Sequence, residues 1–192
     1  MQRGFNFPGL IRLSLRDPVA GGRAVLALDP PMAVRWMMLA ASILASVVLL
    51  YALPVMLGMA GGMPSPVVFA GASGLMNLVA IVLITHVGGI FGGTGRFHDT
   101  LWLMAWLQML TVGMLAAQLA VLVLIPALNT LVTLASVALS IWLLTGFICA
   151  LHGFKSQLLV LVGGMTVLMV VSVALSFLLL LLGVDPTGGT NV

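Results

Sequence analysis

Long runs of apolar residues alternate with short polar breaks along the chain. Five runs are long enough to cross a hydrocarbon core, which needs about 20 helical residues. They cover residues 36–60, 67–90, 101–125, 128–151 and 158–184. The tightest break is Ile125-Pro126-Ala127, and we keep two spans there because about 50 apolar residues cannot cross a bilayer once. The pattern predicts an all-α, polytopic integral membrane protein whose residues 34–184 form a five-helix transmembrane bundle.

An amphipathic segment precedes the first long run. Apolar side chains alternate there with Arg3, Arg12 and Arg16, which suits a short helix at the membrane interface with its arginines toward phosphate. We therefore expect residues 1–33 to form a cytoplasmic interfacial segment. Its role stays open between a basic anchor that only sets the topology and a docking site for a cytoplasmic partner.

Two Asp-Pro pairs in this segment predict helix starts. Asp caps helix N-termini and Pro favours the first helical position. Asp17-Pro18 therefore predicts a second short helix, and Asp29-Pro30 predicts the start of the helix that becomes the first span. Gly21-Gly22 weakens the second prediction, because each Gly in a helix costs about 1 kcal/mol relative to Ala.

The distribution of charge predicts the orientation of the bundle. Hydrophobic residues make up 62% of the chain and charged residues 6%, which excludes an ordinary soluble domain. With five spans, every basic residue falls on one side of the membrane: Arg3, Arg12, Arg16, Arg23, Arg35, Arg96 and Lys155. The positive-inside rule then predicts a cytoplasmic N-terminus, an outside C-terminus and a short external tail, residues 185–192. We expect this basic rim to face anionic lipid headgroups rather than nucleic acid.

Uncharged polar residues recur within the spans at helical spacing. In the fourth run the spacing of four, three and four places them within about 40° of one line on a helix. Such residues tend to face other helices in hydrocarbon, so we interpret them as a packing seam. The alternative is a polar path for a neutral solute or lipid. The seam residues are Asn77, Gln108, Thr111, Gln118, Asn129, Thr133, Ser136 and Ser140.

One motif resembles that of a serine protease, and helix geometry decides whether a histidine can reach its serine. Gly71-Ala72-Ser73-Gly74 has the G-x-S-G pattern of intramembrane serine proteases, which need a histidine within about 3 Å of the hydroxyl. His86 follows Ser73 by thirteen residues, about 20 Å along one helix. With no Glu in the chain and no charged residue in any span, we predict no catalytic residue, no metal site, no cofactor and no enzymatic activity.

The predicted cytoplasmic stretches carry a family resemblance. They are the Pro-bounded residues 17–31, the Gly-rich loop of residues 92–102, and residues 151–156 at the entry to the fifth run. Together with the five-span plan, these stretches resemble the bacterial branch of the Yip family, the Ypt/Rab-interacting membrane proteins. The resemblance implies a non-enzymatic protein that acts through protein and lipid contacts. The family's D-L-Y-G-P type motif has no counterpart here, so we do not expect a Rab-type GTPase as partner.

We therefore expect a scaffold or accessory subunit of a membrane complex, or a protein of membrane organisation, in the bacterial inner membrane. Its expected partners are membrane lipids and other membrane proteins or further copies of itself. The alternative is a small facilitator for a neutral solute or lipid, lined by the seam. Trp36 and Trp102 suit an aromatic belt at the cytoplasmic ends. The candidate contact residues are Arg12, Arg16, Arg96, Phe97, His98, Asp99, His152, Phe154 and Lys155.

Overall fold

The computed structural model describes residues 6–56, 58 and 61–181, and every regular element in them is helical. Five helical segments are long and apolar enough to cross a membrane, which confirms the predicted fold class. They are α3 (Met32–Met56), α4 (Pro66–Ile90), α5 (Phe97–Leu124), the 3-10 turn η1 (Pro126–Leu128) with α6 (Asn129–His152), and α7 (Gln157–Leu181). The predicted ends of the first and fifth spans and the tail of residues 185–192 lie outside the described residues.

Two short helices precede the spans, α1 (Phe7–Arg16) and α2 (Pro18–Leu26). The carboxylate of Asp17 accepts from the backbone N–H of Ala20 at 2.9 Å, so the predicted cap of the second helix is confirmed. The corresponding prediction for Asp29 is wrong. The first helical bonds of α3 go to the carbonyl oxygen of Pro31, while the Asp29 carboxylate pairs with a side chain further along.

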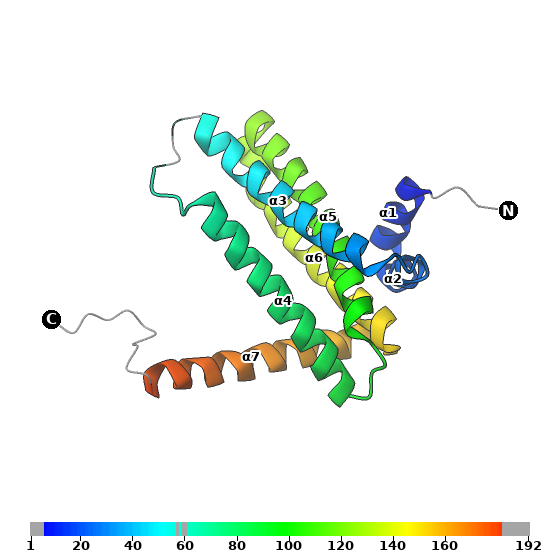
Figure 1. The fold of residues 1–192 in the computed structure, drawn as a ribbon. Helices are drawn as coiled ribbons and strands as arrows, with labels where there is room; N and C mark the ends of the chain where they lie inside the picture. Colours follow the sequence, from blue (N-terminus) through cyan, green and yellow to red (C-terminus); the bar gives the residue numbers. More distant parts are fainter. Residues whose placement is uncertain (1–5, 57, 59–60, 182–192) are drawn as a thin grey trace. The chain divides into compact units, whose positions relative to one another are not determined.

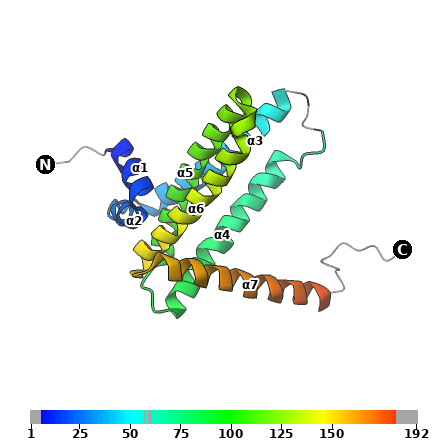
Figure 2. The same cartoon turned by 180° about the vertical axis from the view of Figure 1, so that it is seen from behind.

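The chain divides into two compact units, residues 1–155 and residues 156–192. In the first unit α3, α5 and α6 lie side by side with α4 alongside (Figures 1 and 2). Helix α2 packs against the last turns of α6 and the first turns of α5, and α1 packs against α2. The described part of the second unit is α7 with the turn before it. Its mean hydropathy of 2.6 makes α7 the most apolar of the five spans.

The hydrophobic core of the first unit lies at one end of the bundle. It is formed by the first half of α5, the second half of α6, the first half of α3, part of α2 and Ile81 of α4. The largest almost completely buried side chains that α5 and α6 contribute to this core are Trp106, Leu101 and Leu143. This end also holds the α4–α5 loop and the α1–α2 hairpin, so the most tightly packed part of the unit is the part that carries its charged residues.

The α1–α2 hairpin is fixed to the bundle through two tryptophans of α5. The indole N–H of Trp102 donates to the carbonyl oxygen of Val25 at 2.8 Å, and that of Trp106 donates to Ser14 Oγ at 3.1 Å. Both indoles are buried, so Trp102 is not part of an aromatic belt, contrary to the sequence-based expectation. A buried tryptophan needs a partner for its N–H, and here α1 and α2 provide both partners.

Gly21 and Gly22 allow α2 to pack closely on both of its sides. A Cβ on Gly21 would lie 2.5 Å from Ser14 Cα of α1, and a Cβ on Gly22 would lie 2.8 Å from Ala150 Cβ of α6. Both distances are far below ordinary van der Waals contact. The two glycines that weaken α2 on helix propensity are therefore the residues that allow α1, α2 and α6 to meet.

Candidate functional site

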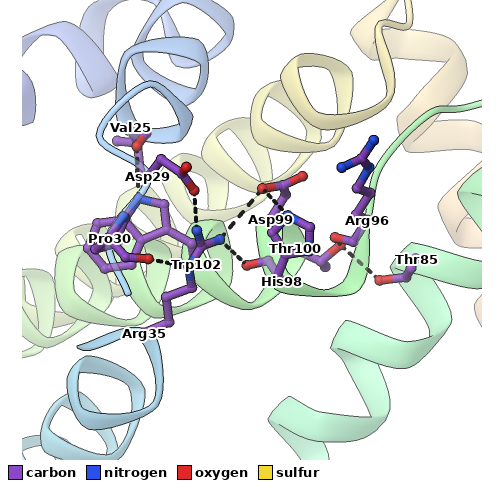
Figure 3. A network of polar contacts seen from close by, with 10 residues as sticks. All are labelled: Val25, Asp29, Pro30, Arg35, Thr85, Arg96, His98, Asp99, Thr100 and Trp102. Carbon is purple, nitrogen blue, oxygen red and sulfur yellow. Dashed lines mark hydrogen bonds and ion pairs between the residues drawn. The ribbon is translucent and has the colours of Figure 1, made fainter. Parts of the chain in front are cut away.

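Arg35 joins the segment before α3 to the start of α5. Its Nε donates to the carbonyl oxygen of Pro30 at 2.9 Å, and its Nη1 donates to that of His98 at 2.7 Å. Nη2 pairs with the Asp29 carboxylate, and Nη1 lies 3.5 Å from an oxygen of Asp99 (Figure 3). All three guanidinium nitrogens are engaged, and the side chain is buried to 5% exposure.

The electrostatics of this cluster suit its position. Arg35 is in the first turn of α3, where the helix dipole disfavours a cation. Asp99 lies in the first turn of α5, where the dipole favours an anion. The two carboxylates of Asp29 and Asp99 compensate the buried guanidinium, and Arg35 in turn holds the starts of two spans together.

His152, the last residue of α6, lies in a space lined by glycines of the α4 end and the α4–α5 loop. The Gly95 N–H donates to His152 Nδ1 at 3.2 Å, so Nδ1 is the unprotonated nitrogen, and Nε2–H donates to the carbonyl oxygen of Ile84 at 3.1 Å. A Cβ on Gly93 would lie 2.2 Å from Nδ1. His152 is therefore a buried packing residue that joins α6 to α4 and the loop, rather than part of an exposed contact surface.

Some of the remaining contact candidates pack on neighbouring rings. Phe97 is half-buried and lies 6.4 Å from Trp36 between ring centroids. Phe154 stacks on the His152 ring at 5.3 Å. His98 is 42% exposed and has Nε2 3.3 Å from the Asp99 carboxylate. The first turn of α5 thus presents one partly exposed histidine, His98, next to the half-buried Phe97.

Several exposed cations without a counter-ion lie at this end of the unit. In the part of the chain that the structure describes, all three carboxylates are engaged: Asp17 caps α2, while Asp29 and Asp99 pair with Arg35. The Arg96 guanidinium points away from the Arg35 cluster (Figure 3). The exposed cations with no ion pair among the described residues are Arg12, Arg16, Arg23, Arg96 and Lys155.

Three of the predicted seam residues, Asn77, Thr111 and Ser140, donate side-chain hydrogen bonds within their own helices. The Asn77 amide donates to the Ser73 carbonyl oxygen at 2.9 Å, and the Ser140 hydroxyl donates to that of Ser136 at 2.8 Å. Thr111 bonds Gln108 in the same way, and Thr133 is exposed. Gln108, Gln118 and Asn129 are half-buried.

Side-chain bonds between the spans come from other residues. The hydroxyl of Thr85 in α4 donates to that of Thr100 in α5 at 2.8 Å, and His152 and Arg35 make the bonds described above. These residues lie at the charged end of the unit. Among the described residues, the side-chain hydrogen bonds that join one span to another are therefore gathered at that end, and not along the predicted seam.

Ser73 and His86 both lie on α4, thirteen residues apart. His86 Nδ1 lies 2.9 Å from the carbonyl oxygen of Val82 one turn earlier. The thirteen-residue separation on one continuous helix keeps the two groups about 20 Å apart. The G-x-S-G pattern therefore brings no histidine to Ser73 from α4.

The fold and this charged end define a polytopic, all-helical integral membrane protein. Comparison of the chain with family models, with curated proteins and with solved structures finds no match.

Proposed function

We propose that the protein is a non-enzymatic, Yip-like scaffold or accessory subunit. Its contact surface is the end of the first unit formed by the α1–α2 hairpin, the α4–α5 loop and the residues 153–155 that follow α6. The observation that carries this proposal is the set of five exposed, unpaired cations above a buried polar cluster. A partner with an acidic surface supplies the missing counter-charges, which gives specificity and fast association.

The hydrogen bonds that hold this surface in place favour a binding role. Arg35, Trp102 and His152 fix the hairpin and the loop to the spans through buried hydrogen bonds. A surface that is already ordered loses little conformational freedom on binding, so more of the contact energy appears as affinity. The partner at this surface is another membrane protein, because a second copy of the chain would bring the same cations and not the missing counter-charges.

The orientation follows from the same charges. Lys and Arg near span ends are retained on the cytoplasmic side, so we place this end in the cytoplasm. The N-terminus is then cytoplasmic, the C-terminus lies outside, and the membrane is the bacterial inner membrane. Membrane lipids contact the basic rim in this arrangement.

The rival function, a facilitator for a neutral solute or lipid, has less support. Among the described residues, a small apolar cavity lies between α4, α5 and α6, and an open groove lies on α3 and α5. Gln108, Gln118 and Asn129 line neither of them. Flux of a neutral solute into proteoliposomes that falls on Gln118→Leu would favour the facilitator.

The scaffold proposal is tested by purifying the tagged full chain from its native membrane in mild detergent and weighing the intact particle. The surface variant carries Arg96→Ala and Lys155→Ala, and the matched control carries Gln118→Ala and Asn129→Ala at the other end of the bundle. We expect a stoichiometric second subunit with the wild type and the control, and its loss from the surface variant. A particle of the same composition for all three proteins contradicts the proposal.

A further inference from the structure

The imidazole of His152 is enclosed by the backbone of three glycines and by one aromatic ring. A Cβ on Gly88 would lie 2.2 Å from its Nε2, one on Gly93 2.2 Å from its Nδ1, and one on Gly95 2.7 Å from its Cε1. The ring of Phe154 stacks on the imidazole with 5.3 Å between the centroids. The three glycines leave no room for a methyl group, and His152 is 3% exposed. These four residues form the cage of His152.

Both ring nitrogens of His152 make hydrogen bonds to the backbone. Nδ1 accepts the Gly95 N–H at 3.2 Å, and Nε2–H donates to the carbonyl oxygen of Ile84 at 3.1 Å. This pair of bonds fits the neutral imidazole, which has one donor and one acceptor nitrogen. A protonated ring is a donor at both nitrogens. Its Nδ1–H would face the Gly95 N–H, so protonation breaks the bond that ties the α4–α5 loop to α6.

The charged groups on the elements around the cage do not compensate a cation there. Among the described residues, no carboxylate bonds to His152, because all three carboxylates have the other partners described above. The face of Phe154 attracts a cation only weakly, whereas a buried charge without a counter-ion is costly. The titratable and charged groups on these elements are His86 on α4, Arg96, His98 and Asp99 at the start of α5, Cys149 on α6, Lys155 after α6, and Asp17 and Arg23 at α2.

We propose that His152 is a proton-sensitive latch: the neutral imidazole ties the α4–α5 loop, residues 91–96, to the end of α6, and protonation of the ring releases the loop. The latch goes beyond the contact surface proposed above and does not depend on it. A released ring is in water, where an imidazole has a pKa of about 6.5. The closed latch is therefore fully stable above that pH and loses stability as the pH falls through it.

The latch is tested by hydrogen exchange of the full chain in an uncharged detergent, followed by NMR at about pH 7.5 and about pH 5.5. The parent chain carries His86→Gln and His98→Gln, so that His152 is its single histidine. Each rate is divided by the rate of the unfolded chain at the same pH. We expect the Gly95 amide to lose about tenfold in protection at the lower pH, because one pH unit below the pKa of a released imidazole stabilises the released state about tenfold.

His152→Gln in the same parent replaces the imidazole by an amide that takes up no proton. We expect its Gly95 amide to have the same protection at both pH values, and residues 113–124 in the far half of α5 to show no change in either chain. Equal protection of Gly95 at both pH values in the parent overturns the latch. A tenfold loss that persists in His152→Gln, or that extends to residues 113–124 in the parent, also overturns it.

A second measurement leaves His152 in place. The nitrogen-15 shifts of its imidazole in the parent chain distinguish the neutral ring with its proton on Nε2, the other neutral tautomer and the ring protonated at both nitrogens. We expect the first of these forms wherever the Gly95 amide is protected. A doubly protonated ring in a chain whose Gly95 amide keeps its protection overturns the latch, because the cage then accepts the charged ring. A neutral ring with its proton on Nδ1 at the higher pH overturns it as well.

Discussion

A side chain at Gly88 of α4 would occupy the space that holds the imidazole of His152 at the end of α6. A Cβ on Gly88 would lie 2.2 Å from His152 Nε2, whereas a Cβ on the next residue, Gly89, would meet nothing within 4 Å. Both glycines are in the same helix. The pair therefore separates the effect of close packing from that of helix propensity.

We predict that Gly88→Ala destabilises the protein by about 1–2 kcal/mol, because overpacking a buried site costs about 1–3 kcal/mol and the gain in helix propensity offsets part of it. Gly89→Ala gains the propensity alone and is neutral or more stable by up to about 1 kcal/mol. Thermal unfolding can be followed by maleimide labelling of Cys149, the single cysteine, which is buried. Equal labelling midpoints for the two variants would argue against the packing of His152 described here.

Gly21→Ala distinguishes helix packing from helix propensity, because the two predict changes in stability of opposite sign. Helix propensity alone predicts a gain of about 1 kcal/mol. The structure predicts a loss of about 1–3 kcal/mol, because the new methyl group meets the backbone of Ser14, which cannot move aside as a flexible side chain can. Hydrogen exchange of α1 and α2 measures the effect, and Gly89→Ala is the control. Slower exchange in Gly21→Ala would contradict the close approach of the two helices.

Arg35→Lys keeps the positive charge but replaces the planar guanidinium, with its three donor nitrogens, by a single ammonium group. A single ammonium cannot reach the acceptors that three guanidinium nitrogens reach, so buried carbonyl oxygens and a carboxylate lose their donor. We expect a loss of about 2–3 kcal/mol, somewhat less than for breaking a fully buried ion pair. Trypsin cleavage after the exposed Arg96 measures opening of the α4–α5 loop. The exposed control Arg23→Lys changes stability by less than about 0.5 kcal/mol, and similar cleavage rates for both variants would show that the Arg35 bonds contribute little.

Trp102→Phe and Trp106→Phe each remove one hydrogen bond between α5 and the hairpin. A typical internal bond contributes about 1 kcal/mol, which corresponds to roughly fivefold more frequent opening. We expect backbone amides of α2 to exchange faster by about that factor, while Trp142→Phe, at an exposed position of α6, leaves them unchanged. Unchanged exchange in all three variants would mean that the hairpin is held by apolar contacts alone.

The number of spans and their approximate positions could be read from the sequence. A bilayer of fixed thickness requires about 20 apolar residues per span, so each span can be identified from its own stretch of sequence. The Asp17 cap could be read for the same reason, since its partner is only three residues away. Yet Asp29 has the same local pattern and a different role, because Arg35 competes for its carboxylate.

The contacts that build the charged end were decided by the tertiary structure. Arg35 reaches a residue 63 positions away, Trp102 one 77 positions away and Trp106 one 92 positions away. His152 is buried because glycines of α4 and its loop leave room for a ring, and no spacing within α6 records that room. Hydropathy and capping depend on neighbours along the chain, whereas burial and hydrogen bonding of these residues depend on how helices far apart in sequence pack together.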